Sequence, residues 1–195
     1  MPPLLLIIAG PNGAGKTTTA MHLLPNVLKI KHFVNADMIA KGLSPFDPTL
    51  ADFQAGKLMV EQMETLIKQR ESFAVETTLA SRSYVSVLKK CREAGYLSEL
   101  LFIALPSPEL AKRRVACRVS QGGHNVPDDI VERRFYRGLK NLFELYMPLV
   151  DKWTIVESID IPIKKIAEKK FCNEEIQFVD KSRFEYYQKL VQSCQ

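Results

Sequence analysis

The fold is decided by the stretch Gly10-Pro11-Asn12-Gly13-Ala14-Gly15-Lys16-Thr17-Thr18-Thr19, which follows the uninterrupted apolar run Leu4–Ala9. Such a run is typical of a parallel strand that is covered on both faces. After the stretch, residues 20–24 favour a helix that ends before Pro25. The spacing G-x-x-x-x-G-K-T between a strand and a helix is the P-loop pattern. We therefore expect a nucleoside triphosphate site, and the alternative is a glycine-rich turn that only links strand to helix.

Each part of the P-loop has a chemical role in holding a triphosphate. The glycines let backbone N–H groups face the phosphates, and the helix N-terminus adds partial positive charge. Lys16 is expected to reach the β- and γ-phosphates as a catalytic group, and the Thr17 hydroxyl to ligate Mg²⁺. The predicted cofactors are therefore ATP and Mg²⁺. The predicted nucleotide-binding residues are Gly10, Pro11, Asn12, Gly13, Ala14, Gly15, Lys16, Thr17 and Thr18.

Strands and helices alternate along the rest of the chain. Further strands are predicted at 32–37, 73–77, 100–105 and 153–157, and helices at 49–70, 84–94, 108–120 and from 128 onward. This alternation indicates a parallel sheet with right-handed crossovers. The expected fold class is α/β: a P-loop NTPase fold with a five-stranded parallel sheet flanked by helices. Residues 1–160 form the predicted core with a lid around 112–140, and residues 161–195 a C-terminal β-hairpin and helix packed on it.

Composition excludes several classes of protein. The chain has 195 residues, 46% of them hydrophobic and 25% charged, which fits one ordinary globular domain. Its longest apolar runs are too short to cross a membrane, and no basic residue precedes the first run to make a signal peptide. We expect a cytoplasmic protein. Cys91, Cys117, Cys172 and Cys194 are widely spaced, which indicates reduced thiols and excludes a zinc or disulfide framework.

The positive charge is concentrated in the lid. The net charge is +5, and residues 112–140 alone hold eight basic and three acidic residues, so the remainder is neutral. Arg114 and Arg118 share one helix face before Gly122-Gly123, and a second group follows at Arg133, Arg134 and Arg137. Like charges at this spacing repel by roughly 0.2–0.5 kcal/mol per pair. Two such clusters beside a flexible loop indicate a polyanion, and the alternative is two solvated faces.

The lid arginines receive separate predicted roles. Arg114 and Arg118 are expected to supply positive charge over a phosphoryl group in transfer, and Arg133 and Arg134 are expected to bind substrate. His124, in the loop between the clusters, is a weaker candidate for a phosphate contact, because a lone loop histidine is usually without a role.

Two carboxylates follow neighbouring strands. Asp37 comes after the second strand, where it could accept the proton of an acceptor hydroxyl and bind substrate; the alternative is a helix N-cap. Glu76 ends the third strand, where it would bind hydrated Mg²⁺ or hold a polar group of the substrate; the alternative is a solvated strand end. Thr77, Ser81 and Arg82 complete the predicted substrate site, the last two for an acceptor's phosphate or sugar.

The class of P-loop protein follows from what accompanies the loop. The chain lacks the Asn-Lys-x-Asp motif of GTPases and the signature segment of ABC-type ATPases. A small-molecule kinase needs a base, a substrate floor and an arginine-bearing lid, and all three are predicted here. A nucleotide-dependent switch that acts through a protein partner is the alternative. A nucleic-acid site ranks last, because the basic segment lacks interleaved aromatic residues.

Four segments together resemble the zeta toxin group of P-loop kinases, more narrowly its short stand-alone bacterial members known as predicted ATPases. They are the P-loop, Asn35-Ala36-Asp37, Glu76-Thr77-Thr78 and the Arg-Val-x-x-Gly-Gly-His-x-Val-Pro segment at 118–127. The resemblance runs from Leu4 to about Glu157. Gly122-Gly123-His124 stands where better-known members have a different loop.

The resemblance implies a reaction and partners. It implies an ATP- and Mg²⁺-dependent kinase whose acceptor is itself a phosphorylated molecule, UDP-N-acetylglucosamine, and which transfers a phosphoryl group to one of its hydroxyls. It also implies that a small epsilon-type antitoxin restrains the kinase. The resemblance further implies Asp37 as the base and Glu76 as a substrate-site carboxylate. Two catalytic arginines flank the lid in that family, and they correspond here to Arg114 or Arg118 for the first and to Arg133 or Arg134 for the second.

Overall fold

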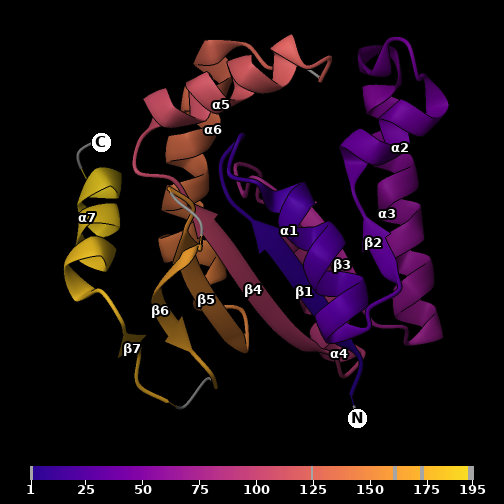
Figure 1. The fold of residues 1–195 in the computed structure, drawn as a ribbon. Coiled ribbons are helices and arrows are strands. Elements are labelled where there is room, and N and C mark those ends of the chain that lie inside the picture. The colour runs from indigo at the N-terminus through magenta and orange to yellow at the C-terminus, as the bar shows by residue number, and fades with distance from the viewer. Residues whose placement is uncertain (1, 124, 160–161, 172–173, 193–195) are drawn as a thin grey trace.

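The computed structural model describes residues 2–123, 125–159, 162–171 and 174–192. In this part of the chain the strands form one seven-stranded sheet in the order β2-β3-β1-β4-β5-β6-β7 (Figure 1). Five neighbouring strands run parallel, which confirms the predicted α/β class. They are β1 (Leu4–Ala9), β2 (His32–Val34), β3 (Phe73–Thr77), β4 (Leu97–Ala104) and β5 (Lys152–Glu157).

The C-terminal hairpin extends this same sheet. Its strands are β6 (Lys164–Lys169) and β7 (Gln177–Phe178), and β6 pairs antiparallel with β5, so that the sheet is mixed. Ile166 and Ala167 of β6 are buried, and the open edge of β5 offers unpaired backbone groups to them. The predicted boundary between residues 160 and 161 lies outside the described residues.

The helices enclose the sheet and reach over one end of it. They are α1 (Lys16–Leu23), α2 (Ala36–Leu43), α3 (Asp52–Gln69), α4 (Tyr84–Glu93), α5 (Pro108–Ser120), α6 (Asp128–Asn141) and α7 (Lys181–Gln192). Figure 1 shows α2 and α3 beside the β2 edge and α7 beyond β6, with α5 above the carboxyl ends of the strands. α5 and α6 contact each other, and α6 contacts α7. The predicted lid is therefore a helical hairpin over the end of the sheet where ligands bind in such folds.

The position of β1 fixes the P-loop. β1 lies between β3 and β4, and Leu5, Ile7 and Ile8 have no exposed surface. The loop after it comes so close to β4 that a Cβ on Gly10, whose φ is +146°, would lie 2.2 Å from the carbonyl oxygen of Ile103. Glycine is required there because no side chain fits and because L-residues rarely adopt that φ.

The second strand is shorter than predicted. It ends at Val34, and Asn35 becomes the N-cap of α2, because its Oδ1 accepts a hydrogen bond of 3.0 Å from the backbone N–H of Met38. Asp37 consequently lies in the first turn of a helix and not at a strand tip, and it is not the cap itself. Among the residues that the structure describes, no helix is both long and apolar enough to span a bilayer.

Candidate active site

A cavity of about 620 Å³ opens at the carboxyl ends of β1 and β3. The P-loop, the start of α2, the β3–α4 loop and both lid helices contribute to its walls. The lining residues that bear on the chemistry are Asn12, Lys16, Thr17, Thr18, Asn35, Asp37, Glu76, Thr77, Ser81, Arg114, Arg118, Arg133, Arg134 and Arg137. The cavity is therefore rich in cations, with six lysine and arginine side chains and two carboxylates on its walls.

Lys16 is a buried cation at the base of the cavity. Its Nζ donates a hydrogen bond of 3.0 Å to the carbonyl oxygen of Pro11 and lies 3.9 Å from Oε1 of Glu76. Burial lowers the pKa of Lys16, although the neighbouring carboxylates of Glu76 and Asp37 raise it. Burial of an ammonium group costs free energy unless it is paired, so an anion arriving at this point is strongly favoured.

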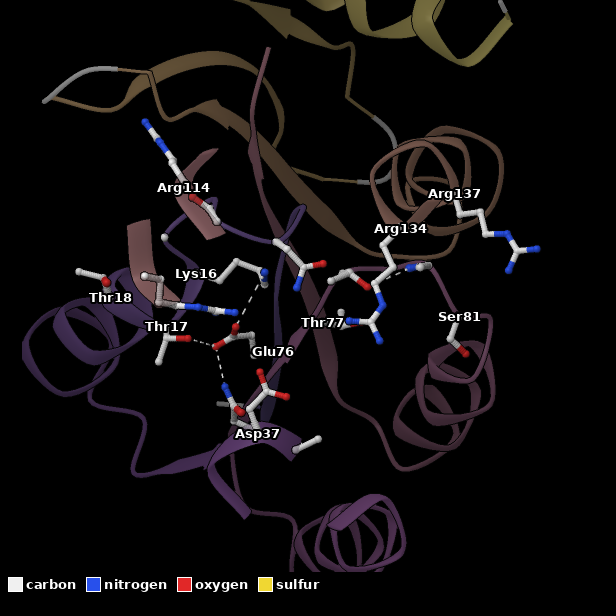
Figure 2. A pocket seen from close by; sticks show the side chains of 18 of the residues that line it. Lys16, Thr17, Thr18, Asp37, Glu76, Thr77, Ser81, Arg114, Arg134 and Arg137 are labelled. Atoms are coloured by element: carbon white, nitrogen blue, oxygen red, sulfur yellow. Dashed lines mark hydrogen bonds and ion pairs between the residues drawn. The ribbon is translucent and has the colours of Figure 1, made fainter. Parts of the chain in front are cut away.

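Glu76 is the centre of the polar contacts in the cavity. Its Oε2 accepts hydrogen bonds from the Thr17 hydroxyl at 2.8 Å and from Nδ2 of Asn35 at 2.7 Å (Figure 2). The strand register explains the meeting, because Val34 pairs with Val75 across β2 and β3, so the next residues of the two strands are neighbours. The predicted alternative of a solvated strand end does not describe this carboxylate, which has three partners.

The Thr17 hydroxyl and the Glu76 carboxylate form a donor set that fits Mg²⁺. This ion prefers hard oxygen ligands, keeps several waters, and is commonly held by one or two carboxylates together with substrate phosphates. The described residues contain no cluster of three or more His, Cys, Asp or Glu side chains that could hold a metal by themselves. A magnesium ion here would thus depend on nucleotide phosphates for the rest of its coordination.

Asn12 contributes a polar atom that is not satisfied by the protein. Within the described part of the chain, its buried Oδ1 has no hydrogen-bond partner. The residue lines the cavity at the tip of the P-loop. Buried polar groups are normally hydrogen-bonded, so this oxygen indicates a ligand with a donor group.

Three predicted P-loop residues shape the loop and do not line the cavity: Gly10, Pro11 and Ala14. Gly10 permits the close approach to β4, and Pro11 accepts hydrogen bonds from Lys16 and from the backbone N–H of Ala14. Their role is to orient the loop, and contact with nucleotide through their backbone remains a prediction.

Asp37 projects into the cavity from the first turn of α2. In Figure 2 its carboxylate lies beside Glu76 and faces the open centre. The start of a helix favours a negative charge. The fold thus brings both predicted carboxylates together, Asp37 from the first turn of α2 and Glu76 from the end of β3.

The lid arginines differ in direction. Figure 2 shows Arg134 pointing toward the centre of the cavity, whereas Arg137 points away from Glu76. Arg118 and Arg133 also line the cavity. Arg137 was not among the predicted substrate-binding residues, although its spacing from Arg134 had placed it on the same helix.

Arg114 holds the P-loop from outside. Its guanidinium donates hydrogen bonds of 3.1 Å to the Ser158 hydroxyl and to the carbonyl oxygen of Ile159, and it lies 3.5 Å from the carbonyl oxygen of Gly13. Figure 2 shows this guanidinium pointing away from Lys16. The contacts give Arg114 a positioning role between the P-loop and the end of β5, and its predicted catalytic role stays a prediction.

The β3–α4 loop is held by the lid helix α6 and by the short π-helix after it (Leu142–Tyr146). Nδ2 of Asn141 donates to the carbonyl oxygen of Leu79 at 2.6 Å, and the Tyr146 hydroxyl donates to that of Ser81 at 2.7 Å. A Cβ on Gly138 would lie 2.2 Å from the carbonyl oxygen of Thr78. These contacts fix the floor on which an acceptor would lie.

The predicted substrate residues on this loop are not all in the cavity. Thr77 and Ser81 line it, but Arg82 does not and is exposed. The structure adds Tyr84, whose hydroxyl lies 3.4 Å from the carbonyl oxygen of Glu76 and whose pKa burial raises to about 12. Sequence reasoning missed Tyr84 because it reads as an ordinary apolar helix position.

The remaining predictions concern His124 and the four cysteines. His124, Cys172 and Cys194 lie outside the described residues. Cys91 is a buried free thiol and Cys117 an exposed one. Neither lines the cavity.

Comparison with known proteins gives a family and a fold. Residues 49–161 match the family model described as zeta toxin. An uncharacterized protein of Haemophilus influenzae is 32% identical over 130 residues, which are 67% of this chain and 91% of that protein.

Solved structures share the fold at low sequence identity. The AvrRxo1-ORF1:AvrRxo1-ORF2 complex with ATP has a TM-score of 0.77 at 18% identity, covering 98% of this chain and 64% of that chain. The PezAT toxin–antitoxin system of Streptococcus pneumoniae has a TM-score of 0.62 at 16% identity, covering 99% and 87%. Shikimate kinase from Bacteroides thetaiotaomicron has a TM-score of 0.52 at 13% identity, covering 98% of both chains. The present chain thus spans just under two thirds of the AvrRxo1-ORF1 chain.

Proposed function

Because the chain belongs to the zeta toxin family and is a P-loop kinase in fold, we propose that it transfers the γ-phosphoryl group of ATP to a hydroxyl of a small phosphorylated acceptor. One observation carries the proposal: a P-loop, two carboxylates and arginines from both lid helices line a single cavity. Phosphoryl transfer needs positioning and positive charge more than covalent chemistry by the protein, and these walls supply both.

The P-loop side of the cavity would hold the nucleotide. Backbone N–H groups at the start of α1 and the buried Lys16 ammonium would bind the phosphates, and the incoming charge would offset the burial of Lys16. Thr17 and Glu76 would hold Mg²⁺, which supplies neutralisation of the charge that builds up on the phosphate oxygens. Arg114 would keep the P-loop fixed against the end of β5.

The opposite side would hold and activate the acceptor. Asp37 would accept the proton of the acceptor hydroxyl while its oxygen forms a bond to the γ-phosphorus and the bond to the β-phosphate oxygen breaks, which leaves ADP. Arg118 and Arg134 would stabilise the negative charge on the group in transfer. Thr77 and Ser81 would contact the acceptor on the floor formed by the β3–α4 loop.

The proposed acceptor is a nucleotide sugar such as UDP-N-acetylglucosamine. Family membership supports it, and so does the charge of the walls, where cations exceed carboxylates by four. That excess is suited to ATP together with a second phosphorylated molecule. Arg133 and Arg134 would bind the acceptor phosphates from α6.

A small antitoxin protein and a cytoplasmic location complete the proposal. Similarity in fold to the PezAT toxin–antitoxin system supports a protein partner. Among the described residues no helix is suited to a membrane, which accords with this location.

The test is a search for product. The protein is incubated with ATP, Mg²⁺ and a panel of UDP-sugars and nucleosides, and the mixture is examined by mass spectrometry for an acceptor heavier by one phosphoryl group. A phosphorylated UDP-sugar that is absent with Lys16→Ala supports the proposal. Tight ATP binding without any product favours a nucleotide-dependent switch, and a pull-down of partners with and without ATP then tests that function.

A further inference from the structure

We propose that Asn35 is a positioning residue that holds the Glu76 carboxylate with one end of its amide and the first turn of α2 with the other. It would thereby set the metal side and the acceptor side of the cavity relative to each other. The inference rests on the function proposed above and goes beyond it, because Asn35 would act through Glu76 and Asp37 without touching phosphate itself.

Both ends of the Asn35 amide are occupied inside the protein. The residue is 5% exposed. Its Nδ2 donates to Oε2 of Glu76 at 2.7 Å, and its Oδ1 accepts from the backbone N–H of Met38 at 3.0 Å. Its backbone carbonyl also accepts from the N–H of Ile39 at 3.1 Å. A side chain held at both ends in this way is fixed in one rotamer.

The role of helix cap does not account for this choice of residue. Serine, threonine and aspartate cap helices as well as asparagine does, because a cap needs only an acceptor oxygen. The contact with Glu76 requires a donor on the same side chain, which an amide provides and a carboxylate does not. From its position directly after β2, the side chain of Asn35 has the length to contact both the Glu76 carboxylate and the backbone N–H of Met38.

The contact determines how the Glu76 carboxylate is aimed. Oε2 accepts from both Asn35 and Thr17, and Oε1 consequently lies on the side of Lys16, 3.9 Å from its Nζ. Without the amide, rotation of the carboxylate would be restrained mainly by the Thr17 hydroxyl. That hydroxyl is also the proposed metal ligand, so Asn35 keeps Glu76 in place independently of the metal.

Asn35 also determines the position of Asp37. Asp37 lies two positions after Asn35, in the turn whose N–H groups at Met38 and Ile39 bond to Asn35. The distance between the two carboxylates of the cavity is thus set through a single side chain. Partners that orient metal-site ligands typically change metal affinity or activity by about 10- to 100-fold when they are removed.

The experiment separates the two ends of the amide. Asn35→Ser keeps an acceptor for the α2 cap, but its single hydroxyl stands in the place of Cγ, one bond short of the Nδ2 that donates to Glu76. ATP binding is measured by calorimetry with and without Mg²⁺ for the full chain, for Asn35→Ser, for Glu76→Ala and for the double variant. The matched control is Asn26→Ser, an exposed asparagine whose Nδ2 bonds to the carbonyl oxygen of His22 away from the cavity.

The expected result is a loss specific to magnesium. Asn35→Ser should reduce the gain in ATP affinity that Mg²⁺ confers by about 10-fold, with a melting temperature close to that of the parent. Adding Asn35→Ser to Glu76→Ala should cause no further loss, because the interaction is already absent. Asn26→Ser should leave all values unchanged.

Two outcomes would overturn the inference. One is an unchanged magnesium effect in Asn35→Ser; the other is an equal loss with and without Mg²⁺ together with a lower melting temperature, which is a purely structural role. Failure of the proposed function looks different: the parent protein itself would then show no magnesium-dependent binding of ATP.

Discussion

The Thr17 hydroxyl donates a hydrogen bond of 2.8 Å to Oε2 of Glu76, although the two residues are 59 positions apart in the chain. The bond joins the first turn of the P-loop helix α1 to the end of β3. It exists because β1 and β3 are parallel neighbours, with Ala9 opposite Thr77. Both side chains offer oxygen atoms as metal ligands at the edge of the cavity, whose base is formed by Lys16. The proposed function places the metal at this pair.

ATP affinity should fall at alkaline pH, earlier than the ordinary pKa of lysine would predict. Burial lowers the pKa of Lys16 in the free protein, and only its charged form attracts phosphate. Rising pH therefore removes the charge, and bound ATP should raise the pKa again, so that binding at alkaline pH takes up a proton. Calorimetry in two buffers of different ionisation enthalpy measures this uptake.

Lys16→Ala is the variant that checks the assignment of this pH effect. It should bind ATP roughly 10- to 100-fold more weakly, because a hydrogen bond to a charged group contributes about 1.5–3 kcal/mol. Its proton uptake should be absent. Lys68→Ala, at an exposed position of α3, should behave as the parent protein. Proton uptake that persists in Lys16→Ala would assign the effect to another group.

Asp37→Asn should lower turnover by about 10²- to 10⁴-fold, the range typical of general-base catalysis. ATP affinity should change little, because Asp37 lies on the acceptor side and the amide keeps its shape. Steady-state kinetics with the acceptor that the product search identifies, together with calorimetry of ATP binding, measures both. Asp129→Asn is the matched control, since Asp129 is exposed and occupies the same second position of a helix, α6. Full turnover in Asp37→Asn would show that the assigned base is wrong.

Arg134→Ala should reduce kcat far more than Arg137→Ala does. The first guanidinium points to the centre of the cavity, and the second points away from Glu76 (Figure 2). Loss of one group that stabilises the transferring phosphoryl typically costs about 10²-fold or more in kcat. The pair of variants is a matched one, because both remove an arginine from the same helix. Equal effects on kcat would contradict the different roles read from their directions.

Gly138→Ala should destabilise the protein by about 1–3 kcal/mol, the usual range for overpacking. The added Cβ would lie 2.2 Å from the carbonyl oxygen of Thr78, so α6 or the β3–α4 loop must move. Gly56→Ala is the control, because a Cβ there meets nothing within 4 Å and alanine favours the helix α3 by roughly 0.5–1 kcal/mol. Urea unfolding of both variants gives the two changes in free energy. A neutral Gly138→Ala would mean that the loop is not held against α6 as described.

Prediction from the sequence was most accurate where the signal is local. The P-loop pattern and the alternation of strands and helices both depend on residues within one turn or one strand of each other. The strand end before Asp37 was mistaken because an extended pattern and a helix N-terminus look alike until Asn35 is seen to bond to Met38. The hairpin was predicted, but its entry into the main sheet depends on the free edge of β5.

The roles that the sequence did not assign belong to side chains whose partners are distant in the chain. Asn35 meets Glu76 across 41 positions, and Asn141 meets Leu79 across 62. Arg114 was predicted from its charge, its spacing and the family resemblance, and its hydrogen bonds to Ser158 and Ile159 add the reason why it points away from Lys16.

By itself, the sequence determined that this protein has a phosphate-binding loop on a buried strand, two carboxylates after later strands and a basic lid. Backbone conformation, apolar periodicity and charge spacing are local properties, so they can be recognised in one dimension. Only the tertiary structure decided that β3 lies between β2 and β1, which brings Asn35, Glu76 and Thr17 into one chain of hydrogen bonds. The order of parallel strands follows from the packing of the whole sheet, and no single segment contains that information.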